Sequence, residues 1–116
     1  MITIRRIYEK SAPEERYKVL IDRLWPRGIS KEKAGWDEWM KEVAPSNELR
    51  KWYNHDPARW EDFKKRYRLE LSYKQAELKK LKQLEKLHGH LTLLFSSKEE
   101  EYNHAVALRG FLGDSD

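Results

Sequence analysis

The sequence predicts a single α/β domain in which helices pack on a small, three-stranded, parallel sheet. Three short apolar or β-branched runs occur at 2–8, 17–24 and 91–95, and the second and third are separated by segments with the apolar spacing of helices. The 116 residues suffice for one hydrophobic core and are too few for two. No repeat or linker interrupts them, so residues 1–116 are interpreted as one domain.

The first two runs predict strands of different exposure. Residues 2–8 alternate apolar and polar side chains, which indicates a half-exposed strand at a sheet edge. In 17–24, Val19, Leu20 and Ile21 are consecutive and apolar, as in the interior of a parallel sheet. This second strand is therefore expected at the centre. Between the two, 11–15 has a helix-start composition but leaves room for only about one turn.

Four segments in the middle of the chain predict helices. Apolar residues at 36, 39, 40 and 43 have helical spacing, and Pro45 ends that segment. Ser46 is a candidate cap for a short helix at 47–53, and Asp56 with Pro57 starts the next one. The leucines of 78–87 mark a further helix that ends at Gly89.

The last strand and helix complete the predicted fold. The strand 91–95 stops at Ser96 and Ser97. Ser97 and Glu100 have the spacing of a capping box, which predicts that the final helix starts there and carries Asn103 and His104. If the strands are parallel, these polar groups and those after residue 21 meet at one edge of the sheet.

The amino-acid composition excludes some classes of protein and favours others. Twenty-four basic and twenty acidic residues give a net charge of +4. This charge favours acidic ligands but is far below that of a strongly basic protein that coats nucleic acid. The absence of cysteine excludes disulfides and thiolate chemistry. No apolar run approaches the length of a membrane span, so we expect a soluble, cytoplasmic protein without a membrane partner. Abundant lysine and glutamate resemble the composition of proteins from thermophiles.

The segment 22–28, with sequence DRLWPRG, predicts an anion site. Arg23 and Arg27 flank a rigid Trp-Pro step at a strand end, and guanidinium groups bind phosphate or carboxylate through paired, charge-assisted bonds. The alternative is that the two arginines pair with the chain's own acids, Asp22, Asp37 or Glu38, and fasten the loop.

Two histidines are candidates for proton transfer, each with a structural alternative. Asp22 and His104 are hypothesised to form an acid/base pair near the arginines, and the same pair could serve only to satisfy a buried imidazole. His55, beside the Asp56 cap, has a side chain suited to proton transfer but is also typical of a helix start. Arg59 either extends the cationic surface or lies over a tryptophan ring.

No metal or cofactor is predicted. His88 and His90 lie at a helix end without a carboxylate at the spacing that would complete a ligand set. No glycine-rich phosphate loop occurs, which argues against a P-loop nucleotidase or a dinucleotide-binding domain.

Three blocks together carry a family resemblance: 19–28, then HDPARW at 55–60 with Phe63 and 66–67, then 93–95 leading to EYNHA at 101–105. The chain resembles the YeaO-like branch of the domain-of-unknown-function family DUF488 over nearly its whole length. The resemblance implies a small α/β domain with its motifs at the strand ends, and it implies no activity. Family members often end the last strand with alanines, and the serines at 96 and 97 therefore argue against a serine nucleophile.

The preferred function is binding of an anionic small molecule, phosphate- or nucleotide-like, in a pocket at the strand ends. The residues expected there are Arg23, Arg27, His55, Arg59, Ser96 and Asn103, with Asp22 and His104 as the catalytic candidates for hydrolysis or group transfer. One alternative is nucleic-acid binding through basic residues interleaved with Trp52, Trp60 and Tyr67. The other is a non-enzymatic homodimer or scaffold built on the leucines of 78–87.

Overall fold

The chain folds around one parallel sheet of four strands, in the order β1-β4-β2-β3. A computed structural model describes residues 1–114. The strands are β1 (Ile2–Arg6), β2 (Tyr17–Leu20), β3 (Glu38–Trp39) and β4 (Leu91–Phe95), and every neighbouring pair is parallel. The α/β class and the parallel arrangement are confirmed, and the predicted number of three strands is corrected to four. β1 lies at an edge and β2 in the interior, as predicted.

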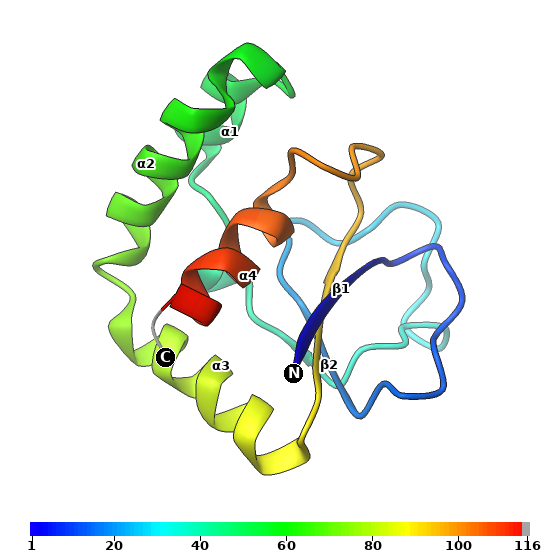
Figure 1. Cartoon of the computed structure of the whole chain (residues 1–116). Helices are drawn as coiled ribbons and strands as arrows, with labels where there is room; N and C mark the ends of the chain where they lie inside the picture. The colour runs from blue at the N-terminus through cyan, green and yellow to red at the C-terminus, as the bar shows by residue number, and fades with distance from the viewer. Residues whose placement is uncertain (115–116) are drawn as a thin grey trace.

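The helices lie on one side of the sheet and long loops lie on the other (Figure 1). The helical elements are the 3-10 turns η1 (Lys41–Val43) and η2 (Pro57–Arg59) and the helices α1 (Asn47–Tyr53), α2 (Trp60–Leu71), α3 (Gln75–His88) and α4 (His104–Asp114). Leu91, Leu93 and Phe95 face the helices and belong to the main core, whereas Thr92 and Leu94 are buried on the loop side. Both faces of β4 are thus covered, which explains its unbroken apolar sequence.

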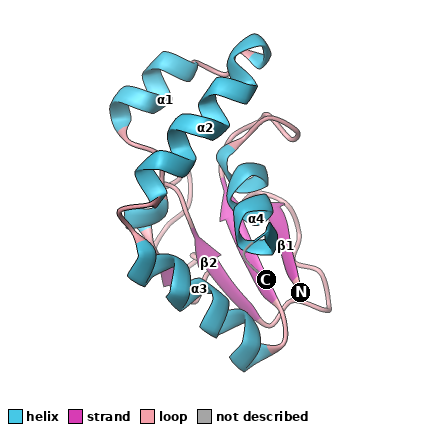
Figure 2. Ribbon diagram, turned by 60° about the vertical axis from the view of Figure 1, so that its left-hand side comes forward, coloured by secondary structure: helices cyan, strands magenta, loops and turns pink. Residues whose placement is uncertain are grey.

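Figure 2 shows α3 and α4 lying along the strands, with α1 and α2 forming a pair beyond the strand ends. α4 contacts β1 and β4, α3 contacts β2 and β4, and α2 packs on both α1 and α4. None of the helices in the described part of the chain has the length and apolar character needed to span a bilayer.

The segment predicted as a helix at 36–43 is instead a short edge strand followed by a 3-10 turn, so that prediction is wrong. The backbone N–H groups of Asp37 and Met40 donate to Lys18 and Leu20 of β2 at 2.8 and 2.9 Å. The apolar residues that produced the helical spacing divide between two sites: Met40 and Val43 enter the core, while the rings of Trp36 and Trp39 pack on Trp25. Pairing with an open strand edge outweighs local periodicity here.

The three other central helices agree with their predicted start and stop signals. The Ser46 Oγ accepts the Leu49 N–H at 3.1 Å, and the Asp56 carboxylate accepts the Ala58 N–H at 3.0 Å. Gly89 ends α3 with φ of 79°, a conformation that favours glycine because it has no Cβ. The short pattern at 11–15 forms a turn rather than a helix.

The leucines of α3 are used within the chain. Leu81 is fully buried, and Leu78 and Leu84 pack against the same core. Only Leu87 of this series is largely exposed, at 76%. The homodimer predicted from these leucines stays a prediction, and most of the apolar surface it would use lies inside the fold.

The predicted start of the last helix at Ser97 is wrong. The Ser97 Oγ accepts the N–H of Glu99 at 3.1 Å within a loop, and α4 begins only at His104, with Asn103 as its cap. The Asn103 Oδ1 accepts the Val106 N–H at 2.9 Å. Glu99, expected in the first turn of the helix, instead orders the loop, because its carboxylate accepts the N–H groups of Glu101 and Tyr102.

Candidate functional site

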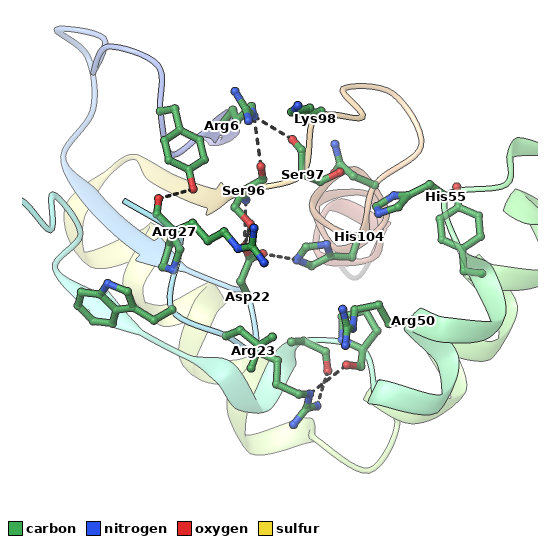
Figure 3. A pocket seen from close by; sticks show the side chains of 18 of the residues that line it. Arg6, Asp22, Arg23, Arg27, Arg50, His55, Ser96, Ser97, Lys98 and His104 are labelled. Atoms are coloured by element: carbon green, nitrogen blue, oxygen red, sulfur yellow. Dashed lines mark hydrogen bonds and ion pairs between the residues drawn. The ribbon is translucent and has the colours of Figure 1, made fainter. Parts of the chain in front are cut away.

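The carboxyl ends of β1, β4 and β2 open into a pocket of about 540 Å³. Parallel strands end at the same edge of the sheet, so the residues that follow them meet although they are far apart in sequence. Arg6 ends β1, Asp22 and Arg23 come shortly after β2, and Ser96 follows β4. The N-terminal part of α4 and residues of α1 supply the other walls (Figure 3).

Asp22, Ser96 and His104 form the centre of the pocket. One oxygen of the Asp22 carboxylate accepts both the backbone N–H and the hydroxyl of Ser96, at 2.9 and 2.6 Å. The other oxygen lies 3.0 Å from the His104 Nε2. Within residues 1–114 this Asp22 oxygen and the His104 Nε2 have no other hydrogen-bond partner, and both atoms are buried. The pair that the sequence suggested is therefore in contact.

The surroundings of Asp22 keep it ionised. Burial alone would raise the pKa of this carboxyl, but bonding to His104 and two hydrogen bonds from Ser96 outweigh burial and lower the pKa below its usual value of 3.8. The carboxylate in turn orients the imidazole, with Nε2 toward Asp22 and only Nδ1 left for any other partner.

Arg23 lies at the pocket wall, but much of its guanidinium is engaged in the fold. Nε donates to the Pro45 carbonyl at 3.2 Å and Nη2 to the Ala44 carbonyl at 3.1 Å, in a direction away from the hollow (Figure 3). These bonds fix the chain between η1 and α1. Of the acids considered as alternative partners, Asp37 accepts the Lys18 N–H, while Glu38 binds Tyr17 and Lys80.

Arg27 is presented toward the pocket by a rigid loop. The indole of Trp25 donates to the Ile29 carbonyl at 2.5 Å, and Tyr8 donates to the Arg27 carbonyl at 2.8 Å. Gly28 has φ of 76°, which allows the chain to turn directly after Arg27. Among the described residues, none pairs with the exposed Arg27 guanidinium, which reaches into the hollow (Figure 3).

The remaining candidates divide between the pocket and its surroundings. His55 lines the pocket and is exposed. Asn103 also lines it, but both polar atoms of its side-chain amide are already bonded: Oδ1 caps α4, and Nδ2 donates to the Glu99 carbonyl at 2.7 Å. Arg59 lies outside the pocket lining. Its guanidinium donates to the Trp52 carbonyl and sits 5.2 Å from the centroid of the Trp52 ring, in agreement with the structural alternative.

Three cationic residues of the pocket are absent from the sequence-based set: Arg6, Arg50 and Lys98. Arg6 and Lys98 follow from the same strand-end rule that selected Asp22 and Ser96, because one ends β1 and the other comes soon after β4. Arg50 has no such signal. It lies on α1, whose position over the strand ends is a result of tertiary packing.

The net positive charge of the chain is concentrated in this pocket. Its lining contains five basic residues, Arg6, Arg23, Arg27, Arg50 and Lys98, against one acid in the described part of the chain, Asp22. Removing these from the 24 basic and 20 acidic residues leaves nineteen of each sign elsewhere. The net formal charge of +4 therefore comes from the residues that line the pocket. A hollow lined mainly by positive charges has a strong positive electrostatic potential.

The rings that a nucleic-acid surface would need are occupied. Tyr67 is fully buried and Trp60 is 9% exposed. Trp52 is covered by two guanidiniums, with that of Arg66 4.1 Å from the ring centroid. Trp60 and Tyr67 are thus used in packing, and nucleic-acid binding stays a prediction.

The two histidines considered for a metal have separate contacts. The ring of His88 stacks on Tyr17 with centroids 4.4 Å apart, and the His90 Nε2 lies 3.3 Å from the Thr3 hydroxyl. No group of three metal-ligating side chains occurs within the described residues.

Comparisons with known proteins place the chain among uncharacterised relatives. A family model described as the inactive DUF488-N3 subclade matches residues 1–115. The uncharacterised protein YeaO of Escherichia coli is 40% identical over 111 residues, which cover 96% of each chain. The uncharacterised proteins Rv3073c of Mycobacterium tuberculosis and Mb3100c of Mycobacterium bovis are each 38% identical over 113 residues, covering 96% of this chain and 92% of theirs. No solved structure matches the chain.

Proposed function

Because the chain belongs to the DUF488 family, in the subclade described as inactive, we propose that its strand-end pocket binds a small anionic molecule without transforming it. The resemblance noted in the sequence is thereby confirmed, and the proposal retains the predicted ligand class. Hydrolysis or group transfer becomes the secondary alternative.

The observation that carries the proposal is the concentration of charge. Five basic side chains and one acid line a single hollow, while the rest of the sequence balances its charges. The side chains of Arg27, Arg50 and Lys98 are exposed and pair with none of the described residues, so their charges remain available to a ligand. Guanidinium and ammonium groups bind phosphate and carboxylate through short, charge-assisted hydrogen bonds.

The centre of the pocket favours binding over reaction. A serine nucleophile needs a base that takes its proton, and a carboxylate with a lowered pKa is a weak base. Asp22 already accepts two hydrogen bonds from Ser96 and contacts His104. In this arrangement Asp22 holds Ser96 and His104 in place, a positioning role that a binding site also requires.

The proposal is tested by calorimetric titration of the protein with inorganic phosphate. Arg27→Ala is expected to weaken binding about tenfold or more, because a charge-assisted hydrogen bond contributes about 1.5–3 kcal/mol. Arg109→Ala is the matched control, since it removes the same charge from an exposed position outside the pocket. Equal affinities in the two variants would remove Arg27 from the site, and no binding by the unaltered protein would refute the proposal.

A further inference from the structure

The pocket has an apolar wall as well as cationic groups. Leu24 lines it with 63% of its surface exposed, between the residues Arg23 and Trp25. Pro45, Tyr53 and Phe63 line the same hollow. Covering this exposed leucine with an apolar ligand group would remove its surface from water, which is favourable.

This wall is held in place before any ligand arrives. The two bonds from Arg23 fix the carbonyls of Ala44 and Pro45. The Tyr53 hydroxyl donates to the Tyr102 carbonyl at 2.7 Å, and its ring stacks on Phe63 with centroids 4.2 Å apart. A preformed surface lowers the ordering cost of binding.

The size of the pocket also exceeds the need of a lone tetrahedral anion. Its volume of about 540 Å³ lies within the roughly 300–1,000 Å³ of sites for organic ligands. Arg27 and Arg50 reach into this space from opposite sides of the view in Figure 3. The hollow thus offers cationic groups for a charged part and apolar surface for an uncharged part.

We propose that the ligand is an organophosphate, a phosphate ester whose organic part is an apolar or aromatic group lying against Leu24 and Pro45. This inference rests on the proposed anion-binding function and specifies its ligand class. The phosphoryl oxygens bind the free guanidinium of Arg27, and the ring or alkyl group covers the exposed part of the wall.

The test compares inorganic phosphate with phenyl phosphate on the same protein by calorimetry. Phenyl phosphate is expected to bind about tenfold more tightly, because burial of apolar surface adds to the same phosphoryl contacts. Leu24→Ala is expected to lose about five- to tenfold in affinity for phenyl phosphate and to leave inorganic phosphate unchanged. Leu69→Ala is the control, since Leu69 has the same 63% exposure and lies outside the pocket.

The outcomes separate this inference from the function on which it rests. Equal affinities for phenyl phosphate and inorganic phosphate would overturn the organophosphate class while the anion pocket stands. An unchanged affinity for phenyl phosphate in Leu24→Ala would overturn the apolar wall. Failure of both compounds to bind would refute the proposed function itself.

Discussion

Asp22 is the residue on which the centre of the pocket depends. Its carboxylate joins the end of β4, through Ser96, to the first residue of α4, through His104. Three partners on one carboxylate compensate for its burial and keep it charged. The same interactions therefore serve both the stability of the fold and the shape of the site.

The lowered pKa of Asp22 predicts a pH dependence of stability. A carboxyl whose pKa is depressed in the folded state stabilises the protein above its unfolded pKa, and this contribution is lost as the pH falls through the folded value. Asp22→Asn is expected to lower the unfolding free energy by about 1–3 kcal/mol at pH 7, since the hydrogen bonds to a charged acceptor are lost. The difference from the unaltered protein should shrink as the pH falls below 3.8, the usual value for this carboxyl.

Urea denaturation at pH 7 and at successively lower pH measures this difference. A difference in unfolding free energy between the two proteins that stays constant down to pH 3 would show that Asp22 is not held ionised by its neighbours.

The sequence allowed the contact between Asp22 and His104 to be predicted, because both follow strand-end segments. It gave no indication that Arg23 would bind two carbonyls, since those lie in a loop placed by tertiary packing.

At the level of elements, the helix signals of the sequence were reliable where side chain and backbone form a local cap. Ser46, Asp56 and Gly89 act on backbone groups only a few residues away, so the local sequence is enough to predict their effect. The segment 36–43 differs because its backbone groups bind β2, a partner about 20 residues away. Long-range pairing of this kind leaves no local signal.

The corrected start of α4 leads to a mutational prediction. Asn103→Ala is expected to lower the unfolding free energy by about 1 kcal/mol or more, because the helix loses its cap and the Glu99 carbonyl loses a donor. Ser97→Ala removes a hydroxyl that orders only the preceding loop and should cost less. Denaturation of the two variants under identical conditions compares them. A larger loss in Ser97→Ala would indicate that Ser97, as first predicted, begins the helix.

At the scale of the whole molecule, the parallel sheet is what creates the site. Its strands bring 6, 22 and 96 to one edge, and α1 closes the pocket from the other side with Arg50 and Tyr53. The class of fold and the edge at which a site would form were both predictable from alternating apolar and helical segments. The concentration of charge was not, because +4 is unremarkable for a chain of this size until the positions of the residues are known.

Whether anions bind in this pocket is tested most directly by a two-dimensional amide NMR titration with inorganic phosphate. The largest shifts are expected in 22–27, 96–98 and at His104, the residues around the strand ends. The lysine-rich α3 provides the competing cationic surface, with Lys79 and Lys86 among its residues. Shifts centred on α3, with the strand-end amides unchanged, would show that anions do not bind in the strand-end pocket.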